Sequence, residues 1–174
     1  SLGLMVPENE SIVWRGPMLM GALQQMLNQV QWGEQDYLFV DLPPGTGDVQ
    51  LTLCQKTDIR GAIIVSTPQD IALLDARKGI DMFKRLDIPI IGLIENMSSF
   101  VCSSCGMTHY PFSNGSLKEE AKKINTQLLG ELPLDLDTRV ASDSGVPIVV
   151  SHPKNPTSIA FFEVAEKLCN FNVR

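Results

Sequence analysis

The sequence predicts an α/β fold in which a mostly parallel sheet is covered by helices on both faces. Three short apolar runs, at residues 37–41, 61–66 and 89–95, do not alternate with polar residues. Such runs are typical of strands that are buried on both sides. Longer segments between them carry apolar residues at helical spacing. This strand–helix–strand order requires right-handed crossovers, and therefore parallel neighbouring strands.

The remaining elements follow in chain order. Pro17 suits the first position of a helix, and apolar residues after it lie on one helical face up to Val30. Residues 69–86 and 157–170 predict two further amphipathic helices, and residues 128–132 are a weaker fourth strand candidate. A length of 174 residues fits one domain spanning 1–174.

Composition excludes several classes of protein. A hydrophobic content of 44% excludes intrinsic disorder. With a net charge of −6 and no basic stripe, we expect no nucleic-acid partner. No apolar run is long enough to span a bilayer, and the last predicted helix is not basic enough for a membrane anchor, so no membrane partner is expected. The first residues lack the pattern of a signal peptide, which favours a cytoplasmic protein.

A carboxylate and a glycine-rich loop follow the first predicted strand. Asp41 is followed by Leu42-Pro-Pro-Gly-Thr-Gly-Asp48. A carboxylate at the end of a buried strand needs a partner, and a Mg²⁺ ion held through water is one such partner in nucleotide sites. Gly45 and Gly47 remove side chains, so that backbone N–H groups can approach a phosphate. An ordinary Pro-Gly turn is the alternative interpretation.

A pair of cysteines follows the third predicted strand, within a predicted metal-binding loop at residues 96–116. In Cys102-Ser-Ser-Cys105-Gly106, two thiolates can lie on one side of a tight loop that the glycine helps to close. A thioredoxin-type redox pair should instead open a helix, whereas the helical pattern here begins only near Leu117. An inert surface pair is the other alternative.

The number of local ligands is two, whereas a tetrahedral site needs four. His109 is a candidate extra ligand, although a lone histidine in a loop is more often solvated. Cys54 and Cys169 lie in predicted helices and are interpreted as small buried hydrophobic residues. Two chains that share one site across a two-fold axis would supply four thiolates, which fits a [4Fe–4S] cluster and also fits zinc.

Several motifs together resemble one family. The segment 41–48 is similar to the Walker B and switch II segment of the Mrp/ApbC family, deviant-Walker P-loop ATPases related to MinD that carry iron–sulfur clusters. Other segments that resemble family signatures are Val13-Trp-Arg-Gly-Pro-Met18, Thr67-Pro-Gln-Asp70, Asp75-Ala-Arg-Lys-Gly79, Glu95-Asn-Met97 and Asp143-Ser-Gly-Val-Pro147. The resemblance covers nearly the whole chain and implies a MinD-like P-loop NTPase fold.

The resemblance also implies roles for individual residues in binding ATP. Asp41 would hold the water of a catalytic Mg²⁺, and Gly45, in the same loop as Gly47, would donate its backbone N–H to the terminal phosphate. Asn96 would bind the adenine edge, because its side chain offers both a donor and an acceptor. Taken alone, Asn96 could equally be a turn residue. The loop 133–137, with Pro133 and Asp135, would close over the base.

For the cysteine pair, the resemblance implies a bridging [4Fe–4S] cluster ligated by Cys102 and Cys105 of two protomers. The implied function is an iron–sulfur cluster carrier ATPase, active as a homodimer, that receives clusters from assembly factors and hands them to apo iron–sulfur proteins. A cytoplasmic location is expected, or the mitochondrial matrix in a eukaryote. The alternatives are a MinD- or ParA-type positioning ATPase and a non-catalytic zinc-binding interaction module.

One family motif does not occur in the sequence. The phosphate-binding loop G-K-G-G-V-G-K-[ST] is absent, so the chain resembles the C-terminal part of the ATPase domain. That loop supplies the lysine and most of the amides that neutralise the phosphates. We therefore expect this chain alone to bind ATP weakly and to be inactive. We also expect an exposed sheet edge where the first strand of the family's domain would pair.

Overall fold

The computed structural model describes residues 16–43 and 45–171, so Pro44 and the first half of the signature at 13–18 lie outside it. The chain divides into two compact units, residues 1–58 and 59–174. The predicted single domain over 1–174 stays a prediction. The elements are α1 (Gly16–Asn28), α2 (Asp48–Lys56), β1 (Ala62–Ser66), α3 (Asp70–Arg85), β2 (Ile90–Val101), β3 (Thr108–His109), α4 (Ser116–Lys123), β4 (Leu128–Leu134), α5 (Leu136–Asp143), α6 (Ile148–Ser151) and α7 (Pro156–Cys169).

The first unit is built on the contact between α1 and α2. The helix predicted after Pro17 is confirmed, and its residues Ala22 and Leu23 are buried. After α1 ends, the indole of Trp32 donates a hydrogen bond of 3.1 Å to the carbonyl of Met26. No helix in the described parts of the chain has the length and apolar character needed to cross a bilayer.

The strand predicted at residues 37–40 is wrong, because this segment has no regular secondary structure. Its side chains are exposed rather than buried, with Phe39 67% accessible, and the rings of Tyr37 and Phe39 stack at 6.4 Å between centroids. A strand is stabilised by hydrogen bonds to a neighbour. Among the described residues of this unit no other strand is present to provide them, so an apolar run alone does not make a strand here.

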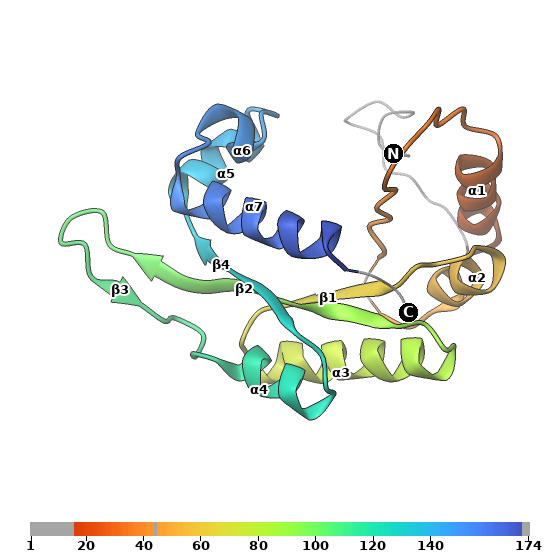
Figure 1. The fold of residues 1–174 in the computed structure, drawn as a ribbon, viewed down its shortest axis with the longest axis horizontal. Helices are drawn as coiled ribbons and strands as arrows, with labels where there is room; N and C mark the ends of the chain where they lie inside the picture. Colours follow the sequence, from red (N-terminus) through yellow and green to blue (C-terminus); the bar gives the residue numbers. More distant parts are fainter. Residues whose placement is uncertain (1–15, 44, 172–174) are drawn as a thin grey trace. The chain divides into compact units, whose positions relative to one another are not determined.

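The second unit contains a four-stranded sheet in which β2 is the central strand (Figure 1). β2 pairs in parallel with β1 on one side and with β4 on the other. The parallel pairing of residues 61–66 with residues 90–94, and the fourth strand at 128–132, are therefore confirmed. β3 adds an antiparallel strand, which makes the sheet mixed. Among the described strands β1 pairs only with β2, as expected for an open edge.

Helices cover both faces of this sheet, as predicted. Figure 1 shows α3 and α4 on one face and α7 on the other. Under α7, buried side chains from both layers form one apolar cluster, to which Ile63, Ala160 and Leu168 add their partly buried side chains. Its buried members are Ile94, Leu129, Leu132 and Val164.

At Gly130, β4 packs closely against α7. A Cβ atom at Gly130 would overlap the Cγ2 of Val164, whose side chain is buried. Residue 130 must therefore be glycine for α7 to lie flat on the sheet. Gly79, inside α3, contrasts with it, because a Cβ atom there would meet no atom within 4 Å.

Substitution of these two glycines by alanine should change the free energy of unfolding in opposite directions. We expect Gly130→Ala to lower the free energy of unfolding by about 1–3 kcal/mol, because an overpacked interface must shift. Gly79→Ala should raise it by about 0.5–1 kcal/mol, since alanine is the better helix former. Urea unfolding followed by circular dichroism measures both. An equal or opposite ranking would contradict this packing of α7 on β4.

Candidate metal centre and nucleotide-binding segments

The cysteine pair lies at the tip of a β-hairpin that extends β2 beyond the sheet. The strand β2 continues to Val101 and returns as β3, with Phe100 opposite His109 and Val101 opposite Thr108. Cys102, seven residues after Glu95, follows directly on the end of β2 at Val101, so this strand is longer than the sequence predicts. The absence of a helix directly after the cysteines, and the start of α4 at Ser116, agree with the expected metal-type turn.

Two backbone hydrogen bonds close the turn. The N–H of Cys102 donates to the carbonyl of Met107 at 2.9 Å, and the N–H of Gly106 donates to the carbonyl of Cys102 at 2.8 Å. Gly106 adopts a φ of +71°, a left-handed conformation that favours glycine. The residue after the second cysteine therefore allows the chain to turn back while both sulfurs stay at the tip.

The sulfur of Cys102 is prepared to carry a negative charge. The backbone N–H groups of Cys105 and Ser104 donate to it and, together with the Cys105 thiol, lower the pKa of Cys102. Cys102 is half-buried and Cys105 is exposed. Because the thiolate is the form that binds metals, this arrangement favours ligation.

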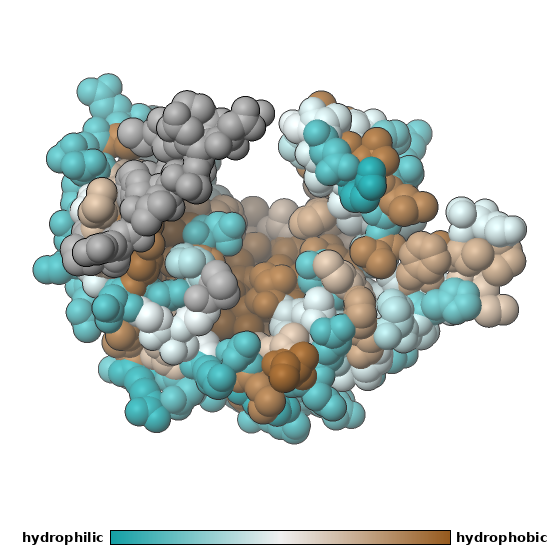
Figure 2. Space-filling model, turned by 180° about the vertical axis from the view of Figure 1, so that it is seen from behind, coloured by the Kyte–Doolittle hydropathy of each residue, from teal (hydrophilic) through white to brown (hydrophobic). Residues whose placement is uncertain are grey.

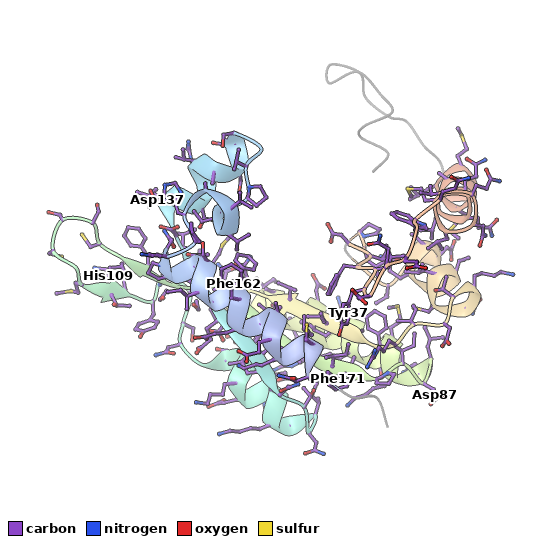
Figure 3. The ribbon with its side chains drawn as sticks, turned by 45° about the horizontal axis from the view of Figure 1, so that its top comes forward. Tyr37, Asp87, His109, Asp137, Phe162 and Phe171 are labelled. Atoms are coloured by element: carbon purple, nitrogen blue, oxygen red, sulfur yellow. The ribbon has the colours of Figure 1, made fainter. Side chains whose placement is uncertain are left out.

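No third ligand joins the pair within the described residues, where no group of three or more histidine, cysteine, aspartate or glutamate side chains is close enough to hold a metal. His109 is exposed on β3 (Figure 3) and is not gathered with the two sulfurs. Cys54 is half-buried in α2, but Cys169 is exposed on α7, so its interpretation as a buried residue is wrong.

Asn96 lies just past the point where the pairing of β2 with β1 ends. Its Oδ1 accepts a 3.0 Å hydrogen bond from the N–H of Met97, which has a φ of +54°. The register between β2 and β4 shifts between Asn96 and Phe100. Since the side-chain oxygen is engaged locally, the amide nitrogen is the group that Asn96 can offer to a ligand.

Pro133 and Asp135 follow on the neighbouring strand. Asn96 is in register with Leu132, so the structure brings Asn96 and Pro133 to the same end of adjacent parallel strands. Asp135 caps α5: its Oδ2 accepts from the N–H of Thr138 at 3.0 Å, from the hydroxyl of Thr138 at 2.7 Å and from Asn155 Nδ2 at 3.2 Å. These bonds fix the loop that follows β4, and they leave Oδ2 little capacity for a ligand.

Asp41, Gly45 and Gly47 belong to the first unit. Asp41 is exposed in an irregular segment, so it does not stand at the end of a strand as predicted. Gly45 has a φ of +96°, which agrees with the need for glycine in that loop. Gly47 precedes α2 with a φ of −85°, a conformation open to any residue. The roles assigned to these three residues stay predictions.

One buried acidic residue received no role from the sequence. Glu95 is 0% exposed at the end of the apolar run of β2. An ionisable residue inside an otherwise apolar strand is a signal that the sequence does contain, because such a side chain needs a partner when it is buried. Its partner is Leu117 in α4, which no spacing rule connects to it.

Comparison with known proteins identifies the family. The family profile described as NUBPL iron-transfer P-loop NTPase matches residues 1–169. The chain belongs to this family. This assignment agrees with the resemblance that the motifs at 41–48 and 95–97 indicate. It also agrees with the mixed α/β sheet of the second unit.

Curated relatives of this NUBPL-type chain include an iron-sulfur cluster carrier protein of Haemophilus influenzae, 48% identical over 97% of this chain and 45% of the relative. The iron-sulfur cluster transfer protein NUBPL of Dictyostelium discoideum is 46% identical over 97% of this chain and 52% of the relative. In Arabidopsis thaliana, an iron-sulfur protein required for NADH dehydrogenase, mitochondrial, is 47% identical. The chain thus spans about half the length of the curated relatives it matches.

Solved structures share the fold. A nucleotide-binding protein of Archaeoglobus fulgidus, solved in complex with ADP, has a TM-score of 0.69 and 39% identity, covering 83% of this chain and 58% of that protein. The cell division ATPase MinD of Pyrococcus furiosus has a TM-score of 0.61 over 86% of this chain and 56% of its own, at 22% identity. The second similarity concerns the fold alone and confirms the MinD-like architecture.

Asp135 provides a test of the loop after β4. We expect Asp135→Ala to lower the free energy of unfolding by about 1–2 kcal/mol, because a helix cap is lost. The matched control is Asp143→Ala at the other end of α5, where the 3.1 Å pair with Arg139 is exposed and contributes less than about 0.5 kcal/mol. Urea unfolding at pH 7 compares them, and equal losses would contradict the assigned cap.

The stability that Asp135 contributes, measured as the difference in free energy of unfolding between the parent and Asp135→Ala, should depend on pH. Burial acts to raise the pKa of Asp135, but the hydrogen bonds from Thr138 and Asn155 outweigh it and lower the pKa. A depressed carboxyl pKa adds stability above the unfolded value of about 3.9, and this stability is lost as the pH falls through the folded pKa. The difference between the parent and Asp135→Ala should therefore narrow in acid, whereas a difference unchanged down to the acid limit would refute the ionised cap.

Proposed function

We propose that this chain is the cluster-binding part of an iron–sulfur cluster carrier, in which Cys102 and Cys105 ligate a [4Fe–4S] cluster shared with the same two residues of a second copy. The observation that carries the proposal is the hairpin tip. It presents two sulfurs, one of them favoured as thiolate, and no third ligand lies near them in the described part of the chain. Two such tips supply the four thiolates that the cluster takes.

The surroundings of the pair suit burial between two copies. Residues 96–116 contain no aspartate, glutamate, lysine or arginine. Figure 2 shows the hairpin projecting at the right-hand edge, where near-white and brown residues predominate. Val101 and Met107, which flank the turn, are 53% and 60% exposed. A surface without charged side chains can be desolvated at lower cost than a charged one when two copies meet.

The relatives support this proposal through their printed functions, which are iron-sulfur cluster carriage and transfer. On the grounds of these printed functions, we propose that the carrier delivers clusters to apo iron–sulfur proteins and receives them from assembly factors. The bacterial relatives favour a cytoplasmic location, and the name of the Arabidopsis relative favours the mitochondrial option. The alternative is a non-catalytic module that binds zinc in place of the cluster, and metal analysis distinguishes it from a cluster carrier.

We also propose that the whole protein hydrolyses ATP with Mg²⁺. Asp41 would hold the metal-bound water, and the loop with Gly45 and Gly47 would bind the terminal phosphate. Asn96, with Pro133 and Asp135, would hold the adenine. The A. fulgidus protein, solved with ADP, supports a nucleotide site in this fold. Such hydrolysis is phosphoryl transfer to water, which positioning and charge neutralisation accelerate.

The cluster assignment is tested by anaerobic reconstitution with iron and sulfide, followed by metal analysis and light scattering. The parent chain should form a dimer with about one cluster for every two chains. Cys102→Ala and Cys105→Ala should each lose iron and dimer together, because one substitution removes two of the four ligands. Cys169→Ala, which removes an exposed cysteine on α7, should behave as the parent.

Two results would overturn the shared site. One is a monomer that keeps a full complement of iron, and the other is a Cys105→Ala variant that still dimerises through its cluster. Zinc recovered in place of iron under strictly anaerobic conditions would favour the interaction module instead.

The nucleotide assignment has its own test. Calorimetric titration of this chain with Mg-ATP should give weak binding or none, and micromolar affinity would contradict that expectation. In a longer protein that includes the G-K-G-G-V-G-K-[ST] loop, Asp41→Asn should reduce ATP turnover on the order of 100-fold, because the anchor of the metal-bound water is lost. The control Asp36→Asn, at an exposed residue nearby, should leave turnover unchanged.

A further inference from the structure

Glu95 connects two elements that are far apart in the sequence. Its side chain is completely buried, and its Oε2 accepts a hydrogen bond of 3.1 Å from the backbone N–H of Leu117. Glu95 is the last residue of β2 that pairs with β1, whereas Leu117 lies in the first turn of α4. The residues between them, 96–116, include Asn96 and the whole cysteine hairpin. A single side chain therefore ties both ends of this segment together.

The start of α4 depends on this bond. The first N–H groups of a helix have no partner inside the helix, and a side chain at the N-cap usually supplies one. Here the N-cap is Gly115, which has no side chain to do so. Glu95 provides the acceptor from the neighbouring strand, and its negative charge is favoured at the positive end of the helix dipole.

Glu95 supplies this contact at a cost in stability. Burial raises the pKa of Glu95, and the backbone N–H groups of Leu117 and Gly115 act to lower it. Glu131, in register on β4, acts to raise it, and the net pKa of Glu95 is raised. Its Oε1 is buried and has no hydrogen-bond partner among the described residues. A buried carboxylate with an unpaired oxygen lowers stability at neutral pH compared with a neutral residue of the same size.

The backbone beside Glu95 also departs from regular strand geometry. Two residues further on, Met97 has a φ of +54°, and the register with β4 shifts between residues 96 and 100. The strand is thus redirected at the point where the hairpin leaves the sheet. Beyond the shift, β2 pairs with β4 again at Phe100, opposite Leu134. The bond from Glu95 to α4 lies on the other side of the shift, at the base of the hairpin segment.

We propose that Glu95 is a positioning residue, which fixes the orientation of the Cys102–Cys105 hairpin relative to the sheet by closing the segment 96–116 against α4. The inference rests on the proposed cluster function and adds to it a residue that touches neither sulfur. A cluster shared by two copies requires both hairpins to present their sulfurs in one geometry. Misplacement by about 1 Å in a ligand set is enough to impair such a site.

Two variants of Glu95 separate positioning from a general contribution to folding. Glu95→Gln keeps the size and one acceptor oxygen but loses the charge, and hydrogen bonds to ionised groups are about twice as strong as neutral ones. Glu95→Leu fills a similar volume and has no acceptor. The matched control is Glu120→Gln, at a buried glutamate on α4 that pairs at 2.8 Å with Arg77 of α3.

The first measurement is hydrogen exchange at the amides of Cys102 and Gly106, which close the turn, compared with amides of α7. Exchange at the turn should be slowest in the parent, intermediate in Glu95→Gln, and about tenfold or more faster in Glu95→Leu, while α7 stays protected. The free energy of unfolding should stay near that of the parent in both variants, because losing the buried charge offsets the loss or weakening of the acceptor for the Leu117 N–H. Glu120→Gln should show the reverse pattern, with lower stability and unchanged exchange at the turn.

The second measurement is cluster content and dimer formation after anaerobic reconstitution, which should fall in the order parent, Glu95→Gln, Glu95→Leu. Turn exchange in Glu95→Leu equal to the parent would overturn the proposal, as would a loss of protection spread evenly over α7. If Glu95→Leu does not fold, Glu95→Gln decides: parental exchange overturns the role and faster exchange at the turn alone supports it. A parent that takes up no cluster refutes the proposed function, and the exchange ranking still decides the role of Glu95.

Discussion

The pairing of β2 on both of its edges is the constraint on which the second unit depends. β2 exchanges backbone hydrogen bonds with β1 and β4 at once, so its register defines which side chains face α3 and α4 and which face α7. That register places Ile94 beside Gly130 and under Val164, and it places Glu95 on the opposite face, toward α4. Because β2 runs on into the hairpin, the same register also determines where the two cysteines emerge.

The candidate nucleotide and metal segments of this unit share that strand. Asn96 is the first residue after Glu95, and Cys102 follows six positions later. A shift of β2 would therefore move both, without any contact between a nucleotide and a cluster. Two sites on one strand can be coupled in this way only if both ligands bias the same conformational equilibrium, and the redirected backbone at Met97 is the natural place for such a change.

The sequence predicts the parts of the fold that depend on local pattern. Residues 61–66 and 90–94 form parallel strands because buried apolar runs in an α/β chain have few other arrangements. The segment 37–40 has the same pattern and forms no strand, because pairing depends on a neighbour that a local pattern does not describe. The continuation of β2 through Ser98 and Ser99 is equally hidden, since polar residues and a left-handed Met97 would usually end a strand.

The candidate site likewise has features that the sequence predicts and features that it does not. The cysteines and Gly106 are evident from spacing, because a tight metal-type turn is a local structure. The contact from Glu95 to α4 spans 22 positions and uses a backbone donor, which leaves no trace in the type of residue at 117. The cap formed by Asp135 is predictable only in part. An aspartate at the start of a helix is recognisable in the sequence, but its hydrogen bond to Asn155, the N-cap residue of α7, is not.

Because Pro156 follows Asn155, the hydrogen bond between Asn155 and Asp135 is protected from deamidation. Deamidation of asparagine begins when the next backbone nitrogen attacks the side-chain carbonyl, and proline has no N–H to do so. The amide that donates to Asp135 is therefore protected from conversion to a carboxylate, which would repel it. Asn114, exposed and followed by Gly115 just before α4, has no such protection. As the protein ages, new negative charge is therefore expected first at Asn114, in the segment 96–116 that contains the cysteine hairpin and begins without charged residues.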